Sequence, residues 1–176
     1  MILVTGPARS GKSEWAEWLA RQTGQPVTYI ATARRDPADV EWNARIEAHR
    51  RRRPPEWKTL EVTRELGEIV RASSGCLLVD SLGTWVANEL EEDDASWNSI
   101  QDAFLQSLEC ASGEVIVVAE ETGWGVIPAY PLGRTFRDRL GMLIRRVGAI
   151  ADPVYLVTGG HAVNLSALGS PLPVRD

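Results

Sequence analysis

The sequence is poor in cysteine and in long apolar segments, and each shortage excludes a class of protein. Cys76 and Cys110 are the only cysteines, and neither belongs to a metal-binding pair, so a disulfide framework is not expected. No apolar run approaches the ~20 residues that span a bilayer, and the opening residues 1–6 are typical of a buried strand rather than a signal peptide. We therefore expect a protein of the reducing cytoplasm with no membrane span.

Basic residues are also outnumbered by acidic ones, 19 against 24, which gives a formal net charge of −5. General nucleic-acid binding needs a basic surface, so no nucleic-acid partner is expected. The arginines nevertheless fall into two clusters, which are Arg50–Arg53 and the group Arg134, Arg137, Arg139, Arg145 and Arg146. The simplest interpretation of the second cluster is a solvated helical face, with a functional role as the open alternative.

Short β-branched runs alternate with amphipathic segments along the whole chain. Strands are expected at 2–5, 27–31, 57–62, 75–80, 114–119 and 153–158, with a further short strand near 162–165. Helices are expected at 11–22, 37–49, 65–72, 82–90, 97–110 and 132–149. This alternation predicts one α/β domain over 1–176, with a mostly parallel sheet that carries helices on both faces, as in P-loop nucleotide-hydrolysing proteins.

The helix expected at 37–49 has a recognisable start. Asp36 is predicted to be its N-cap and Pro37 its first residue. Val40, Ala44 and Ile46 are then expected to face inward.

The first strand leads directly into a phosphate-binding motif. The segment matches the pattern G-x-x-x-x-G-K-[ST] at every fixed position, and its residues are Gly6, Pro7, Ala8, Arg9, Ser10, Gly11, Lys12 and Ser13. In such a loop the backbone N–H groups and the helix N-terminus solvate the phosphates, the lysine reaches the β and γ phosphates, and the hydroxyl binds Mg²⁺. Lys12 and Lys58 are the only lysines in an arginine-rich chain, which indicates a chemical need for lysine at position 12.

Acidic residues end two of the expected strands. Asp80 follows an apolar strand, where a carboxylate would approach Mg²⁺ through water; a helix cap is the structural alternative. Glu120 and Glu121 end a second strand and point in different directions, so one of them is expected to face the site. Either carboxylate could act as general base or as a water-mediated metal ligand, and a solvated loop acid is the alternative.

His49 stands at the end of a helix, directly before four arginines. Neighbouring cations favour a neutral imidazole, which is the form needed to accept a phosphoryl or nucleotidyl group. The alternative is a surface histidine that caps the C-terminus of the helix. The spacing alone leaves both interpretations open.

Taken in order along the chain, these segments resemble the bifunctional adenosylcobinamide kinase and adenosylcobinamide-phosphate guanylyltransferase family of cobalamin biosynthesis. The resemblance rests on 2–6, 8–13, 29–32, Arg45-Ile46, His49, Arg53-Pro54, Trp57, Asp80, Asn88, 121–125, Pro128 and 136–138. It implies two reactions: transfer of a phosphoryl group from a nucleoside triphosphate to adenosylcobinamide, and transfer of GMP from GTP to the resulting phosphate. GTP and ATP are then the nucleotide substrates, and a homotrimer is implied.

The resemblance also implies roles for individual residues. His49 stands where family members carry GMP covalently, and Arg50, Arg51, Arg52 and Arg53 would neutralise phosphate charge. Further nucleotide contacts are implied at Thr32, Ala33, Arg34 and Glu61. We assign Ser13 and Asp80 to Mg²⁺, and Glu121, rather than Glu120, to the aminopropanol hydroxyl.

The chain departs from the family pattern at Glu120, near Ile144 and at Gly159-Gly160-His161. The alternative function is therefore a P-loop small-molecule kinase without guanylyl transfer. A GTPase switch would need a guanine-reading Asn/Thr-Lys-x-Asp element; Lys58 is followed by Thr59-Leu60, so the element is absent. A purely structural role would leave the P-loop and the strand-end acids unexplained.

Overall fold

The computed structural model describes residues 1–173, and its centre is one seven-stranded sheet in the order β3-β2-β4-β5-β1-β6-β7. The strands are β1 (Ile2–Gly6), β2 (Val27–Ala31), β3 (Lys58–Glu61), β4 (Cys76–Asp80), β5 (Glu114–Glu120), β6 (Val154–Thr158) and β7 (His161–Asn164). All neighbouring pairs are parallel except β6 and β7. The expected mostly parallel sheet is confirmed.

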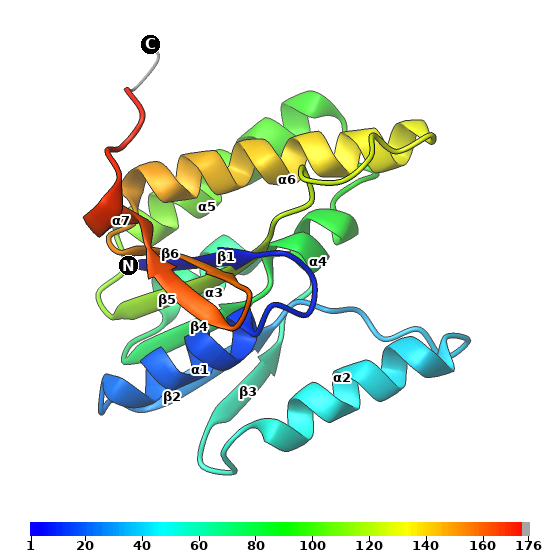
Figure 1. Ribbon diagram of the computed structural model, residues 1–176. Coiled ribbons are helices and arrows are strands. Elements are labelled where there is room, and N and C mark those ends of the chain that lie inside the picture. The colour runs from blue at the N-terminus through cyan, green and yellow to red at the C-terminus, as the bar shows by residue number, and fades with distance from the viewer. Residues whose placement is uncertain (174–176) are drawn as a thin grey trace.

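The helices cover both faces of this sheet (Figure 1). They are α1 (Lys12–Gln22), α2 (Val40–Arg52), α3 (Leu66–Ala72), α4 (Leu82–Asn88), α5 (Asp94–Glu109), α6 (Pro131–Ile150) and α7 (Leu165–Leu168). Helix α1 packs on one face, and α3, α5 and α6 pack on the other (Figure 1). This arrangement confirms the α/β class.

The two faces divide the side chains of each central strand. In β1, Leu3 belongs to the core beneath α5 and α6, whereas Val4 belongs to the core beneath α1. In β5, Val117 likewise faces the α6 side and Val118 the α1 side. Because side chains alternate along a strand, this parity fixes the face that each strand-end acid occupies.

Helix α2 differs from the prediction. It begins at Val40 and ends at Arg52, and its N-cap is Asp39, whose carboxylate accepts a hydrogen bond from the amide of Trp42. The predicted cap Asp36 instead accepts a bond from Ala38 in the preceding turn. The structure describes every residue of α2 and none is buried; Val40 is 79% exposed. The expected inward face was therefore wrong, because α2 lies apart from the sheet (Figure 1).

Two other segments correct the sequence analysis. Helix α5 begins at Asp94 rather than at 97, because Asp93 caps it by accepting from the amide of Ser96. Arg139 of the second arginine cluster is buried rather than solvated. Its guanidinium donates to the carbonyls of Glu89 and Glu92, which ties α6 to the turn between α4 and α5.

Candidate active site

The phosphate-binding loop lies between β1 and α1, at the carboxyl edge of the sheet. Gly6 passes close to β6, and a Cβ at this position would lie 2.3 Å from the carbonyl oxygen of Val157. Gly11 has a φ of 92°, which only glycine adopts without strain. Both fixed glycines of the motif are thus required by backbone geometry.

Lys12 lies at the first position of α1 and is 8% exposed. Its ammonium donates to the carbonyl of Pro7 across the loop at 3.3 Å. The side chain is therefore held over the loop, where it would meet phosphates bound by the N–H groups. Ser13, the next residue, is half-buried at the same helix end.

Asp80 and Glu120 share the face of the sheet on which α1 lies, by the parity of β4 and β5. Tyr29 donates its hydroxyl to Asp80 Oδ2 at 2.5 Å. Burial raises the pKa of Tyr29, with a smaller contribution from the charge of Asp80, so this hydroxyl stays a donor. Asp80 is thereby oriented from β2, the neighbouring strand.

Glu120 is held by the turn that follows β4. Its carboxylate accepts from the Ser81 hydroxyl at 2.5 Å and from the Gly83 amide at 2.8 Å. Burial raises the pKa of Glu120 most strongly, and the charge of Asp80 raises it further, whereas Ser81 and Lys12 lower it. Glu120 thus belongs to one electrostatic group with Lys12 and Asp80.

Glu121 points to the opposite face, toward α6. Its Oε1 accepts from the Thr5 hydroxyl at 2.7 Å, and its backbone amide donates to Gly6 at 2.9 Å. The expectation that the two adjacent glutamates diverge agrees with these contacts. Glu120 feels the charge of Lys12, whereas Glu121 lines a separate cavity beside α6.

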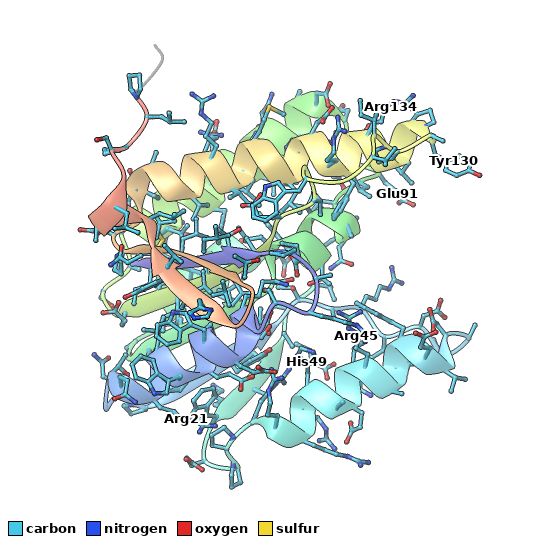
Figure 2. The ribbon with its side chains drawn as sticks, viewed as in Figure 1. Arg21, Arg45, His49, Glu91, Tyr130 and Arg134 are labelled. Carbon is cyan, nitrogen blue, oxygen red and sulfur yellow. The ribbon has the colours of Figure 1, made fainter. Side chains whose placement is uncertain are left out.

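His49 lies on the side of α2 that faces the sheet (Figure 2). Burial lowers the pKa of His49 most strongly, and the charges of Arg52 and Arg45 lower it further, whereas Asp80 and Glu17 raise it. The neutral imidazole that the sequence analysis expected is therefore favoured. His49 therefore feels the charge of Asp80, the acid at the end of β4.

The arginines that follow His49 have separate partners. Arg50 and Arg51 both pair with Glu47 on the exposed side of α2. Arg52 reaches α1, where it pairs with Glu14 at 3.0 Å and with the buried Glu17 at 2.8 Å. Arg53 lies 3.5 Å above the ring of Tyr29. Arg52 and Arg53 therefore attach the end of α2 to the body of the protein.

The remaining predicted nucleotide contacts are spread out. Thr32 is buried and donates to the carbonyl of Ser81 at 2.7 Å. Ala33 is half-buried, whereas Arg34 is exposed. Glu61 is exposed at the end of the edge strand β3, 3.7 Å from Arg35.

Four supporting residues were missed or left without a role by the sequence analysis. Asn88 donates to the carbonyls of Thr32 and Thr63 and so connects the segments that follow β2 and β3. Glu17, Tyr29 and Ser81 hold Arg52, Asp80 and Glu120 respectively. Their partners are distant in sequence, so no local motif could have shown these contacts.

The donors around the P-loop suit Mg²⁺. Across the described chain, His, Cys, Asp and Glu side chains do not gather in threes around a point that could hold a metal ion. Mg²⁺ does not need such a cage, because it keeps several waters and is bound by one or two oxygen donors together with substrate phosphates. The Ser13 hydroxyl and the Asp80 carboxylate fit that requirement, and Glu120 adds a carboxylate on the same face of the sheet as Asp80.

The fold and this loop define a P-loop nucleotide-binding protein. Residues 2–165 match the family model described as cobinamide kinase / cobinamide phosphate guanyltransferase (CobU), and the chain belongs to this family. It is 40% identical over 174 residues to the bifunctional adenosylcobalamin biosynthesis protein CobP of Pseudomonas aeruginosa, covering 97% of this chain and 98% of the relative. It is 37% identical to the corresponding CobU protein of Escherichia coli, covering 94% and 99%.

Solved structures support the same fold. An ATPase from the type III secretion system of pathogenic bacteria superimposes with a TM-score of 0.55 at 12% identity, covering 96% of this chain and 58% of that one. At this identity the likeness shows the fold alone. Within residues 1–173, no helix has the length and apolar character needed to cross a membrane.

Proposed function

We propose that this protein catalyses both reactions of its family: phosphorylation of adenosylcobinamide by a nucleoside triphosphate, and transfer of GMP from GTP to the product. The observation that carries the proposal is a histidine whose neutral form is favoured and which faces the body of the protein, where the charge of the strand-end Asp80 acts on it (Figure 2). A kinase alone would need the P-loop and the strand-end acids but no nucleophilic imidazole. Family membership over residues 2–165 supports the bifunctional assignment over that alternative.

In the guanylyl transfer, the P-loop amides and Lys12 bind the triphosphate. A ring nitrogen of His49 attacks the α-phosphorus, so that a P–N bond forms and the bond to the bridging oxygen breaks, releasing pyrophosphate. An oxygen of the acceptor phosphate then attacks the same phosphorus, and the P–N bond breaks. The products are neutral His49 and adenosylcobinamide-GDP.

In the kinase reaction, the aminopropanol oxygen attacks the γ-phosphorus and the nucleoside diphosphate leaves. Glu121 is proposed to accept the hydroxyl proton, because its carboxylate lies on the face of the sheet opposite α1 and is oriented by Thr5. Bound Mg²⁺ would neutralise charge on the phosphate oxygens, held by Ser13 with Asp80 near it. Ser10 Oγ is buried without a partner among the described residues, which leaves it available to a phosphate oxygen.

The other proposed nucleotide contacts, the subunit count and the cellular compartment follow from the family. Arg50–Arg53, 32–34 and Glu61 are proposed to contact nucleotide once GTP or ATP is bound. For Arg52 and Arg53 this contact would require exchanging their present partners. The enzyme is proposed to work as a homotrimer in the cytoplasm, where free cysteines such as Cys76 and Cys110 persist.

The proposal is tested by intact-protein mass spectrometry after incubation with GTP and Mg²⁺, with His49→Ala measured in parallel. We expect an acid-labile adduct of the mass of GMP on the wild type and none on His49→Ala. His49→Ala should still bind GTP and keep its kinase activity. Wild-type protein that binds GTP without forming the adduct would leave only the kinase reaction.

A further inference from the structure

A cavity of about 530 Å³ lies between the segment that follows β5 and the helix α6. Its polar lining includes Glu121 and Thr122 from the sheet edge and Arg137 and Asp138 from α6. Met142 and Ile144 supply apolar surface farther along the same helix. The nucleotide-binding motif contributes no residue to this lining, so the cavity is a second compartment beside the P-loop.

The cavity and the P-loop are joined through Glu121. The Glu121 amide bonds to Gly6, the first residue of the loop, at 2.9 Å. Its side chain is fixed by Thr5 through Oε1, and within residues 1–173 its Oε2 accepts no hydrogen bond. A molecule in the cavity therefore meets a carboxylate oxygen at the point where the phosphate-binding loop begins.

Arg137 places a positive charge across the cavity from this carboxylate. The Arg137 side chain is 22% exposed, and its guanidinium donates to Asp138 Oδ1 at 3.1 and 3.2 Å. Asp138 itself is 60% exposed. A bond to such an exposed carboxylate contributes little, so the guanidinium can exchange it for a bidentate contact with a phosphate.

We infer that this cavity is the acceptor site, in which Glu121 receives the hydroxyl of adenosylcobinamide and Arg137 binds the phosphate of adenosylcobinamide phosphate. The inference rests on the proposed function and assigns the two acceptors of that function to one compartment. The two reactions need side chains of opposite charge. The first acceptor loses a proton to a base, and the second carries negative charge that a cation would bind. Glu121 and Arg137 supply these groups from opposite walls.

The loop that continues from the cavity lining offers apolar surface to a large corrinoid. The loop from Gly123, which lines the cavity, to the start of α6 carries large apolar side chains with more than half of their surface exposed: Trp124, Val126, Ile127, Tyr130 and Leu132. Tyr130 extends away from the body of the protein (Figure 2). Both acceptors share the macrocycle, so this loop should contribute equally to both, whereas Arg137 should distinguish them.

The test compares Arg137→Met with Arg146→Met, a variant of the same helix in which the lost guanidinium pairs with Asp102 outside the cavity. For Arg137→Met we expect the KM for adenosylcobinamide phosphate to rise roughly 10- to 100-fold, the effect of one charge-assisted contact. The KM for adenosylcobinamide in the kinase reaction should change less than about twofold, as should the rate of adduct formation on His49, which needs no acceptor. Arg146→Met should match the wild type in all three.

A wild-type KM for the phosphate acceptor in Arg137→Met would overturn the inference. An equal loss in adduct formation would also overturn it, because Arg137 would then act on nucleotide or on folding. Trp124→Ser should raise both acceptor KM values by a similar factor; a changed subunit count in light scattering would instead assign the loop to contacts between copies. If the wild type forms no adduct, the proposed function fails, and equilibrium binding of the two acceptors to Arg137→Met still tests the cavity.

Discussion

At the scale of single residues, the surroundings of His49 decide whether it is a nucleophile. Its pKa lies below the ordinary value because of burial first and of neighbouring arginines second. A protonated imidazole has no lone pair to attack phosphorus, so the rate of adduct formation should fall only when the pH drops through this lowered pKa. We expect the acid limb of the pH profile below about 6.5, measured by quenched-flow mass spectrometry with GTP.

Arg45 provides a directed test of that electrostatic effect. It lies one helical turn before His49, and its charge lowers the pKa of the imidazole. Arg45→Met should move the acid limb to higher pH, toward the ordinary histidine value. Arg71→Met, an exposed change on α3, should leave the limb in place. A limb that stays fixed in Arg45→Met would mean that Arg45 does not contribute to the lowered pKa of His49.

At the scale of elements, α2 is held by its C-terminal turn. Glu17 is 4% exposed on α1 and binds Arg52 through both carboxylate oxygens, whereas Glu14 binds the same arginine from an exposed position. Removing the buried charge weakens the attachment of the turn that follows His49, and removing the exposed one has a small effect. The position of His49 thus depends on a contact between two helices.

Glu17→Gln should therefore slow adduct formation on His49 by roughly tenfold or more, the effect of losing one charge-assisted hydrogen bond of about 1.5 kcal/mol. Glu14→Gln should stay within about twofold of the wild type. Hydrogen exchange of the α2 amides should accelerate in Glu17→Gln and not in Glu14→Gln. Equal adduct rates in the two variants would show that Arg52 does not position His49.

At the scale of the whole molecule, the contributions of sequence and of tertiary structure separate clearly. Motifs contiguous in sequence, such as the P-loop and Asp80 at the end of an apolar strand, could be predicted because local chemistry and strand order determine them. The sheet face that each of Glu120 and Glu121 occupies, and the partners that hold it, became clear only from the strand parity and the turn at Ser81. Arg139 and α2 were predicted wrongly, because burial depends on neighbours that are distant in the chain.

The subunit count is a property of the whole molecule that the family resemblance predicts. A trimer should show a mass of about three times the 19.4 kDa of one chain in multi-angle light scattering. The value should persist on dilution through the concentrations used for activity. A mass equal to that of a single chain, measured on fully active protein, would contradict the trimer. Each active site would then be formed by one chain alone.

Nucleotide binding should stabilise the whole fold, because the P-loop connects the interior strand β1 to α1. A ligand that binds only the folded state at about 100 times its Kd adds about 2.7 kcal/mol to the free energy of unfolding. For a chain of this size that corresponds to an increase in Tm of roughly 5 to 10 °C with GTP and Mg²⁺, measured by scanning calorimetry. Lys12→Ala should lose most of this increase, because its ammonium no longer meets the phosphates, while its Tm without nucleotide stays close to that of the wild type. An increase in Tm that survives in Lys12→Ala would place the nucleotide elsewhere than in the loop 6–13.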